Sequence, residues 1–413
     1  MGVNSGTAIT SGEKNTAIGS YSLMDNSTGS YNTALGDRAL RYNTTASNNT
    51  ALGYHSLYVN TTGTQNTAVG VSTLDANTTG HYNTAIGNNA LTTNTTGQSN
   101  TAVGRGSLTT ATTASNNTGV GYGSLNLTTT GASNTGVGYF SLTANTTGAA
   151  NVAIGDDALK SNTTADNNTA VGTSALQANT TASYITGVGY QALKLNTTGT
   201  ANVALGADAL RQNLTGADNV AVGNNALALN TASNNTAVGK NALTANTTGE
   251  YNTAIGSASL DANTTGTRNT AVGRAALGAN TTASDNTALG HFALNVNTTG
   301  ANNTALGRAT LSANTTASNN TALGYSALTT NTTGTYNTSV GTQALQANTS
   351  AGSGVAIGYN ALAANKTGAS CTAVGATALA ANTTGTSNAA FGYGALDANT
   401  TGSYNTGIGR HSL

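Results

Sequence analysis

The side chains that could carry out chemistry are few and widely separated. They comprise one cysteine, Cys371, and four histidines, His55, His81, His291 and His411. The spacing of these residues gives no metal-ligand cluster, and no nucleophile stands in sequence with a base and an acid in the way a catalytic set requires. We therefore expect a protein that is not an enzyme and that needs no cofactor. The structural elements that carry these residues are more informative about the protein.

Those elements are copies of one 17-residue repeat, represented by Asn83–Ser99 (NTAIGNNALTTNTTGQS). We number repeat positions 1 to 17 from Asn83. Positions 1–5 read Asn-Thr-Ala-aliphatic-Gly, positions 8 and 9 read Ala or Ser then Leu, and positions 12–15 read Asn-Thr-Thr-Gly. Residues 15–413 hold 24 starts, the last one truncated, and residues 1–14 form a degenerate leading copy. One residue is lost in the turn at residues 230–234, after which the frame resumes.

Composition excludes several classes of function. Charged residues are 6% of the chain and the net charge is zero, so no basic field is present to hold nucleic acid. No apolar run reaches the roughly 20 residues of a membrane span, and we expect no membrane insertion. The chain contains no proline, which suits a structure that uses every backbone N–H in a ladder.

The repeat predicts an all-β fold, a parallel β-solenoid (a β-roll or β-helix) of 17-residue coils. Glycine, asparagine and threonine dominate, and all three are poor helix formers. Positions 4 and 9 are five residues apart, a spacing that does not place them on one helical face. Thr-Ala-aliphatic and Ala-Leu are typical of short strands, and the Gly-x-x and Asn-Thr-Thr-Gly segments between them are typical of turns.

Stacking places equivalent residues of successive coils over one another, so each position becomes a column. We expect positions 4 and 9 to form the core columns, represented by Ile18, Leu23, Ile86, Leu91, Val103, Leu108, Ile255 and Leu260. We expect positions 1 and 12 to form asparagine ladders in the turns, represented by Asn83, Asn94, Asn252 and Asn263. If position 4 points inward, alternation turns the small residues at positions 3 and 5 outward, as a stripe that packs against other chains.

Two surface features have alternative interpretations. Asn-Thr-Thr matches the N-glycosylation acceptor pattern in nearly every coil, for example at Asn60, Asn77, Asn179 and Asn399, although a ladder of asparagines explains the same string. Tyrosine recurs at positions 6 and 17, where it could stack on sugar rings or could cover turn backbone. Host-surface glycans are therefore a possible partner.

The strings NTAIG, NTALG and NTAVG, together with NTTG, resemble the repeat shafts of trimeric phage tail fibres and spikes. They are similar to the head repeats of trimeric autotransporter adhesins as well. This resemblance covers residues 15–413 and implies three chains to a fibre, intertwined or side by side, used for surface attachment. The 17-residue period is longer than the usual adhesin-head repeat of about 14 residues, and no neck, coiled coil or anchor accompanies it.

The leading hypothesis is a structural fibre or shaft that is a homotrimer, extracellular or on a virion surface, and that serves attachment. One alternative is an extracellular filament that grows by end-to-end stacking, because Leu413 ends in the middle of a coil. Another is an ice-binding solenoid, because threonine dominates positions 2, 13 and 14. A β-helix polysaccharide lyase would rest on fold analogy alone.

Overall fold

The structure, a computed structural model, describes residues 2–413 and is all-β, with no helix among those residues. Every strand is three residues long and occupies repeat positions 2–4. The described chain divides into two compact units, one ending at Ala207 and the other comprising Asp208–Leu413. Each unit is a parallel β-solenoid, as the repeat predicts.

The first unit contains twelve strands. They are β1 (Thr16–Ile18), β2 (Thr33–Leu35), β3 (Thr50–Leu52), β4 (Thr67–Val69), β5 (Thr84–Ile86), β6 (Thr101–Val103), β7 (Thr118–Val120), β8 (Thr135–Val137), β9 (Val152–Ile154), β10 (Thr169–Val171), β11 (Thr186–Val188) and β12 (Val203–Leu205).

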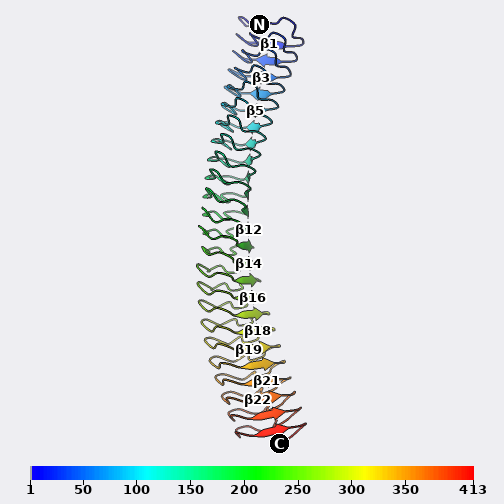
Figure 1. Cartoon of the computed structure of the whole chain (residues 1–413), viewed down its shortest axis with the longest axis vertical. Coiled ribbons are helices and arrows are strands. Elements are labelled where there is room, and N and C mark those ends of the chain that lie inside the picture. Colours follow the sequence, from blue (N-terminus) through cyan, green and yellow to red (C-terminus); the bar gives the residue numbers. More distant parts are fainter. Residues whose placement is uncertain (1) are drawn as a thin grey trace. The chain divides into compact units, whose positions relative to one another are not determined.

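The second unit contains the other twelve strands, which Figure 1 shows stacked in one column. They are β13 (Val220–Val222), β14 (Thr236–Val238), β15 (Thr253–Ile255), β16 (Thr270–Val272), β17 (Thr287–Leu289), β18 (Thr304–Leu306), β19 (Thr321–Leu323), β20 (Thr338–Val340), β21 (Val355–Ile357), β22 (Thr372–Val374), β23 (Ala389–Phe391) and β24 (Thr406–Ile408).

Within each unit, every strand pairs in parallel with the equivalent strand of the next coil. In the first unit, Thr84 of β5 pairs with Thr101 of β6, exactly one repeat further on. In the second unit, Val220 pairs with Thr236, only 16 residues away, and the offset returns to 17 in the next pair. The missing residue is therefore absorbed in the turn at residues 230–234, and the strand register stays intact, as the sequence predicts.

The core of each coil is narrow and half polar. Positions 1, 3, 8, 9, 12 and 15 are buried, which gives two asparagines, one leucine and three small residues per typical coil. Leu23, Leu91, Leu108 and Leu260 are fully buried, so the prediction of a leucine column at position 9 is confirmed.

The leucine at position 9 is held in an unusual backbone conformation. Its φ angle lies between 48° and 54° in the complete coils, in the left-handed region that L-residues with a large side chain seldom adopt. Positions 7 and 17 are left-handed as well, for example Asn89 (φ 56°) and Ser99 (φ 57°). These residues bend the chain sharply enough to close a coil in 17 residues, and at position 9 the leucine side chain is directed into the interior.

The prediction that position 4 forms a core column is wrong. Ile18, Ile86 and Ile255 are 50%, 40% and 41% exposed, and Val103 is only half-buried. Strand residues alternate between the two faces of a sheet, and here the alanine at position 3 faces inward, so positions 2 and 4 face outward. The physical reason is space, because the leucine at position 9 fills the interior and leaves room for a methyl group only.

The predicted outer stripe of small residues is wrong for the same reason. Ala85 and Ala90, at positions 3 and 8, are fully buried. The glycine at position 5 is required by its own coil stack and not by another chain. Gly87 has a φ of 129°, and a Cβ added to it would lie 2.7 Å from the carbonyl carbon of Gly104 in the next coil.

Both asparagine ladders are confirmed. At position 12, the Nδ2 amide of Asn94 donates to Oδ1 of Asn77 one coil earlier (2.7 Å) and to the carbonyl of Gly97 (3.0 Å). At position 1, Nδ2 of Asn83 donates to the same Gly97 carbonyl (2.9 Å). Oδ1 of Asn83 accepts the backbone N–H of Asn100 (3.0 Å).

The second unit repeats this arrangement. Asn263 donates to Asn246 and to Gly266, and Asn252 donates to Gly266. Two amides thus converge on one carbonyl at position 15 in each typical coil, and most of the buried amides of the turn find their partners within the stack.

Candidate functional site

The outward face of the strands carries a continuous apolar column in each unit. We call it the aliphatic strip and define it as the residues at position 4. In the first unit it consists of Ile18, Leu35, Leu52, Val69, Ile86, Val103, Val120, Val137, Ile154, Val171, Val188 and Leu205. In the second unit it consists of Val222, Val238, Ile255, Val272, Leu289, Leu306, Leu323, Val340, Ile357, Val374, Phe391 and Ile408.

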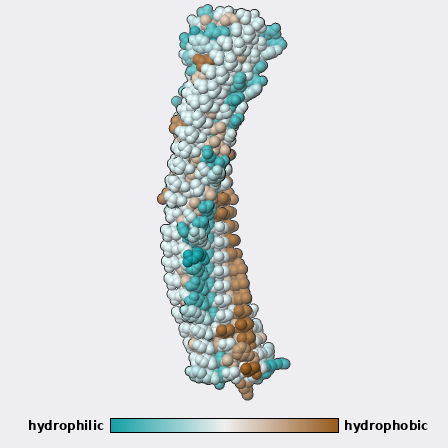
Figure 2. All heavy atoms as spheres, in the orientation of Figure 1, coloured by the Kyte–Doolittle hydropathy of each residue, from teal (hydrophilic) through white to brown (hydrophobic). Residues whose placement is uncertain are grey.

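The strip of the second unit is visible as a brown column in Figure 2. Its members are half-buried to exposed, and no polar residue interrupts the column in either unit. A continuous apolar surface of this kind marks an interaction site, because single exposed aliphatics are common whereas long ordered rows are not. The strip is therefore the best candidate functional site.

The neighbours of the strip leave it accessible. Position 5 beside it is glycine, which has no side chain to cover the aliphatic group. Position 2 on the same face is threonine in most coils, and Thr33 and Thr50 are exposed there. The result is a narrow face on which an aliphatic column lies beside a column of mostly hydroxyl-bearing side chains. The charged residues lie at other positions of the coil.

The asparagines of the Asn-Thr-Thr strings are not available for glycosylation in the folded chain. Asn60, Asn77 and Asn179 are fully buried, and their amides take part in the position 12 ladder. Asn399 is partly exposed, but its amide donates to Asn382 and to Gly402. The prediction of glycosylation sites is therefore wrong for the folded solenoid, and the hydrogen-bonding role explains the string.

The side chains singled out for possible chemistry remain apart. His81 accepts a hydrogen bond from the backbone N–H of Thr64 (3.0 Å), and His291 lies 3.4 Å from Arg274. Cys371 is buried in the position 1 column, and this burial raises the pKa of its thiol. Within residues 2–413, no group of three or more His, Cys, Asp or Glu side chains is placed to hold a metal ion.

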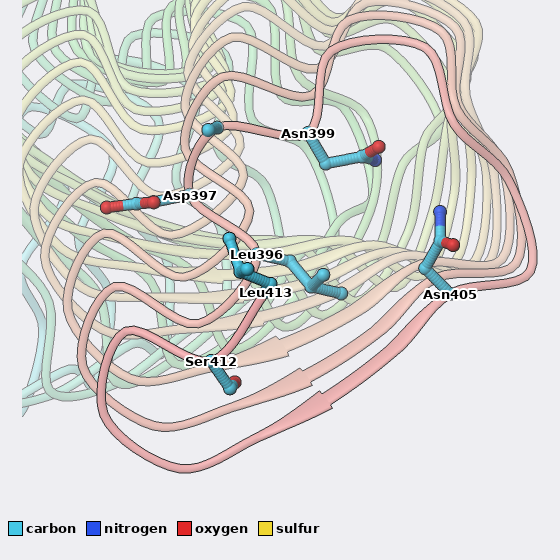
Figure 3. Close-up of a pocket in the computed structure, with 7 residues that line it drawn as sticks. Leu396, Asp397, Asn399, Asn405, Ser412 and Leu413 are labelled. Atoms are coloured by element: carbon cyan, nitrogen blue, oxygen red, sulfur yellow. The ribbon is translucent and has the colours of Figure 1, made fainter.

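A hollow of about 220 Å³ lies at the last coil (Figure 3). Asn399 and Asn405 direct their amides toward one another across its corner, and Leu396 lies beside them (Figure 3). The equivalent positions 12, 1 and 9 form the buried interior of earlier coils. The hollow is therefore a cross-section of the solenoid core and not a ligand site.

Comparison with known proteins identifies no family for this chain, so its class is defined by the geometry of the fold. The chain matches no protein-family model, and a search of curated proteins gives no match either. Among residues 2–413, no helix is long and apolar enough to cross a membrane. The class that the fold defines is a parallel β-solenoid protein with a tandem 17-residue repeat.

Proposed function

We propose that this protein is a structural fibre component whose solenoid associates with further copies of itself through the aliphatic strip. The single observation that supports the proposal is that the strip is apolar in every coil. A monomer in water gains nothing from exposing such a row, whereas association removes it from water at about 25 cal/mol per Å².

A second copy of the chain is the partner that fits the strip best. Two copies share the same spacing between coils, so their strips can face one another residue by residue along a whole unit. The zero net charge of the chain adds no electrostatic repulsion between copies. Three strips that meet around a common axis give a homotrimer, and we propose this arrangement for an extracellular or virion-surface fibre that serves attachment.

The test is the mass in solution of the full chain, measured by sedimentation equilibrium. The test variant places lysine at three adjacent members of the strip, Leu35, Leu52 and Val69. The control places lysine at Thr45, Thr62 and Thr79, which are exposed at position 14 of the same three coils. The wild type and the control should sediment as trimers, and the strip variant should sediment as a smaller species with an unchanged circular dichroism spectrum. A monomeric wild type, or a strip variant that keeps its mass, would refute the proposal.

A second candidate function, ice binding, is favoured by one observation. The threonines at position 2 form an outward column beside the strip, on the same face of the sheet. Thermal hysteresis in a solution of the purified chain discriminates between the two functions. Hysteresis from a monomer supports ice binding, whereas a trimer without hysteresis supports the fibre.

A further inference from the structure

The first unit carries a cluster of charged and aromatic side chains, centred on two arginines, that the fibre role does not use. Arg38 and Arg41 belong to the same coil, and no other coil of the chain has two basic residues. Four tyrosines and His55 surround them at positions 6, 7, 10 and 11 of three successive coils. The tyrosines are Tyr21, Tyr42, Tyr54 and Tyr58. We call these seven residues the arginine–tyrosine cluster.

Aromatic rings hold both guanidinium groups in place. The Arg41 guanidinium lies 4.9 Å from the ring centre of Tyr42 and 5.3 Å from that of Tyr21. The Arg38 guanidinium lies 6.0 Å from the Tyr21 ring. Cation–π contacts of this kind orient a guanidinium and leave the N–H groups at its edge free to donate.

Hydrogen bonds to neighbouring side chains also hold the two guanidinium groups in place. Nη1 of Arg38 donates to the Tyr54 hydroxyl (3.5 Å) and to Nε2 of His55 (3.4 Å). Nη1 of Arg41 donates to the Tyr58 hydroxyl (3.5 Å). The Tyr54 oxygen acts as an acceptor in its contact with Arg38, so its own O–H is left to donate. The Tyr58 hydroxyl is hydrogen-bonded to Tyr42 as well, and this bond raises the pKa of Tyr58.

His55 is part of the same framework. Its ring stacks between Tyr54 and Tyr58, with centroids 4.2 Å apart on both sides. Because Nε2 accepts from Arg38, the ring proton is on Nδ1, which faces the Asp75 carboxylate at 3.8 Å. The Asp75 carboxylate therefore lies beside the imidazole of His55 and not beside either arginine.

Among the residues that the structure describes, the two guanidinium groups of the cluster have no carboxylate partner. Lys160, Arg211 and Arg268 form ion pairs with aspartates, whereas neither arginine of the cluster does so within residues 2–413. Asp25 and Asp37 are close in the repeat but do not pair with them. Nε of both Arg38 and Arg41 is buried without a hydrogen-bond partner. The cluster is therefore rich in fixed donors and poor in acceptors.

We propose that the arginine–tyrosine cluster binds an acidic polysaccharide through its carboxylate or sulfate groups. A pair of planar guanidiniums matches the paired oxygens of such groups. The Tyr54 hydroxyl, which accepts from Arg38, supplies its O–H as a donor for the hydroxyl groups of the sugar. The aliphatic strip is made of different residues, so the site does not depend on self-association of the chain.

The experiment measures binding of the full chain to three polymers by isothermal titration calorimetry. Polygalacturonate presents carboxylates, dextran sulfate presents sulfates, and unmodified dextran presents neither. The test variant is Arg38→Ala with Arg41→Ala. The control is Arg105→Ala with Arg308→Ala, which removes the same charge from two arginines that each lie over a single tyrosine ring.

The wild type should bind at least one charged polymer and not dextran, and the charged polymer bound identifies the oxyanion. The test variant should lose about tenfold or more in affinity, as the removal of hydrogen bonds to a charged group requires, while the control keeps its affinity. Arg38→Lys with Arg41→Lys should bind weakly, because it keeps the charge without the planar fork.

Three results would overturn the proposal. They are equal losses in the test and control variants, no binding to either charged polymer, and tighter binding to duplex DNA of matched charge than to both polysaccharides. Circular dichroism of each variant separates loss of the site from loss of the fold.

Discussion

Nδ2 of Asn94 donates a 2.7 Å hydrogen bond to Oδ1 of Asn77, its equivalent in the preceding coil. The same bond recurs in most neighbouring coils, and the buried turn is held by a column of amides. The column is broken in the next two coils, where Ala111 and Thr128 occupy position 12. Oδ1 of Asn94 and Oγ1 of Thr128 are buried there without a hydrogen-bond partner.

Restoring this column should stabilise the first unit. In the variant Ala111→Asn with Thr128→Asn, the new amide at 111 can donate to Asn94 and to the carbonyl of Ala114. That carbonyl accepts one side-chain amide, from Asn100, where a typical coil provides two. We expect the free energy of local opening to rise by about 1–3 kcal/mol, measured by hydrogen exchange of the flanking coils.

The control for this prediction is Thr113→Asn, two residues away and exposed. It adds an amide outside the column and should leave the exchange rates within about 0.5 kcal/mol of the wild type. A double variant that exchanges no more slowly than this control would contradict the role of the ladder.

Positions 3 and 4 should differ in their tolerance of leucine. Ala85→Leu adds volume to an interior that has room for a methyl group, and we expect a loss of about 1–3 kcal/mol. Ile86→Leu changes an outward residue of the strip and should leave the stability nearly unchanged. Thermal unfolding followed by circular dichroism compares the two variants. Equal melting temperatures would contradict the assignment of position 3 to the interior and position 4 to the surface.

The two glycine columns should differ in their tolerance of alanine. Gly87→Ala forces a Cβ onto a φ of 129°, a backbone conformation that L-residues seldom adopt, and we expect a loss of about 1–3 kcal/mol. A Cβ at Gly97 would press on the carbonyl oxygen of Ala114, but Gly97 is not among the glycines with a positive φ. Gly97→Ala should therefore cost less than about 1 kcal/mol, because position 15 already carries alanine at Ala46 and Ala114, where the stack adjusts to it. Chemical denaturation of the two variants is the measurement, and a larger loss in the second would be inconsistent with this assignment.

Two aspartates of the second unit should give opposite dependences of stability on pH. Burial raises the pKa of Asp261, so folding disfavours its charged form, and this cost disappears as the pH falls toward the ordinary carboxyl range. Asp261→Asn should therefore stabilise the unit at pH 7, with a gain that shrinks on acidification to about pH 4.

The matched variant is Asp285→Asn. A hydrogen bond from Arg268 lowers the pKa of Asp285, so the stability it contributes is present above the ordinary carboxyl pKa and is lost as the pH falls through the lowered value. This pair is exposed and screened by salt, so the loss at pH 7 should be small. Melting temperatures from pH 7 to pH 3 check both signs, and shifts in the same direction at pH 7 would contradict them.

Much of the coil could be predicted from the repeat, but the direction of its strand could not. The period, the leucine at position 9 and the ladders of Asn83 and Asn94 follow from residue types that recur in register. Successive side chains of a strand point to opposite faces, so the pattern shows only that Ala85 and Ile86 face opposite ways. Because isoleucine is the more hydrophobic of the two, it is the residue expected to face inward. The left-handed leucine reverses that choice, because it fills the interior.

A signal of this arrangement was present in the sequence. Position 3 accepts only alanine, glycine or serine, such as Gly119 and Ser339, which is typical of a site limited in volume. Position 4 accepts residues as different as valine and Phe391, which is typical of a surface. The arginine–tyrosine cluster was missed for another reason, since most of its contacts join residues 16 to 20 apart, which are neighbours only after the coils stack.

The half-polar interior has a consequence for how the solenoid responds to temperature. Exposure of apolar surface raises the heat capacity on unfolding, whereas exposure of polar groups lowers it. Each coil buries two asparagine amides against a single leucine, so its heat-capacity increment should fall below the roughly 12–15 cal/mol/K per residue of ordinary globular proteins. A small increment flattens the stability curve, and the solenoid should lose little stability between cold water and body temperature.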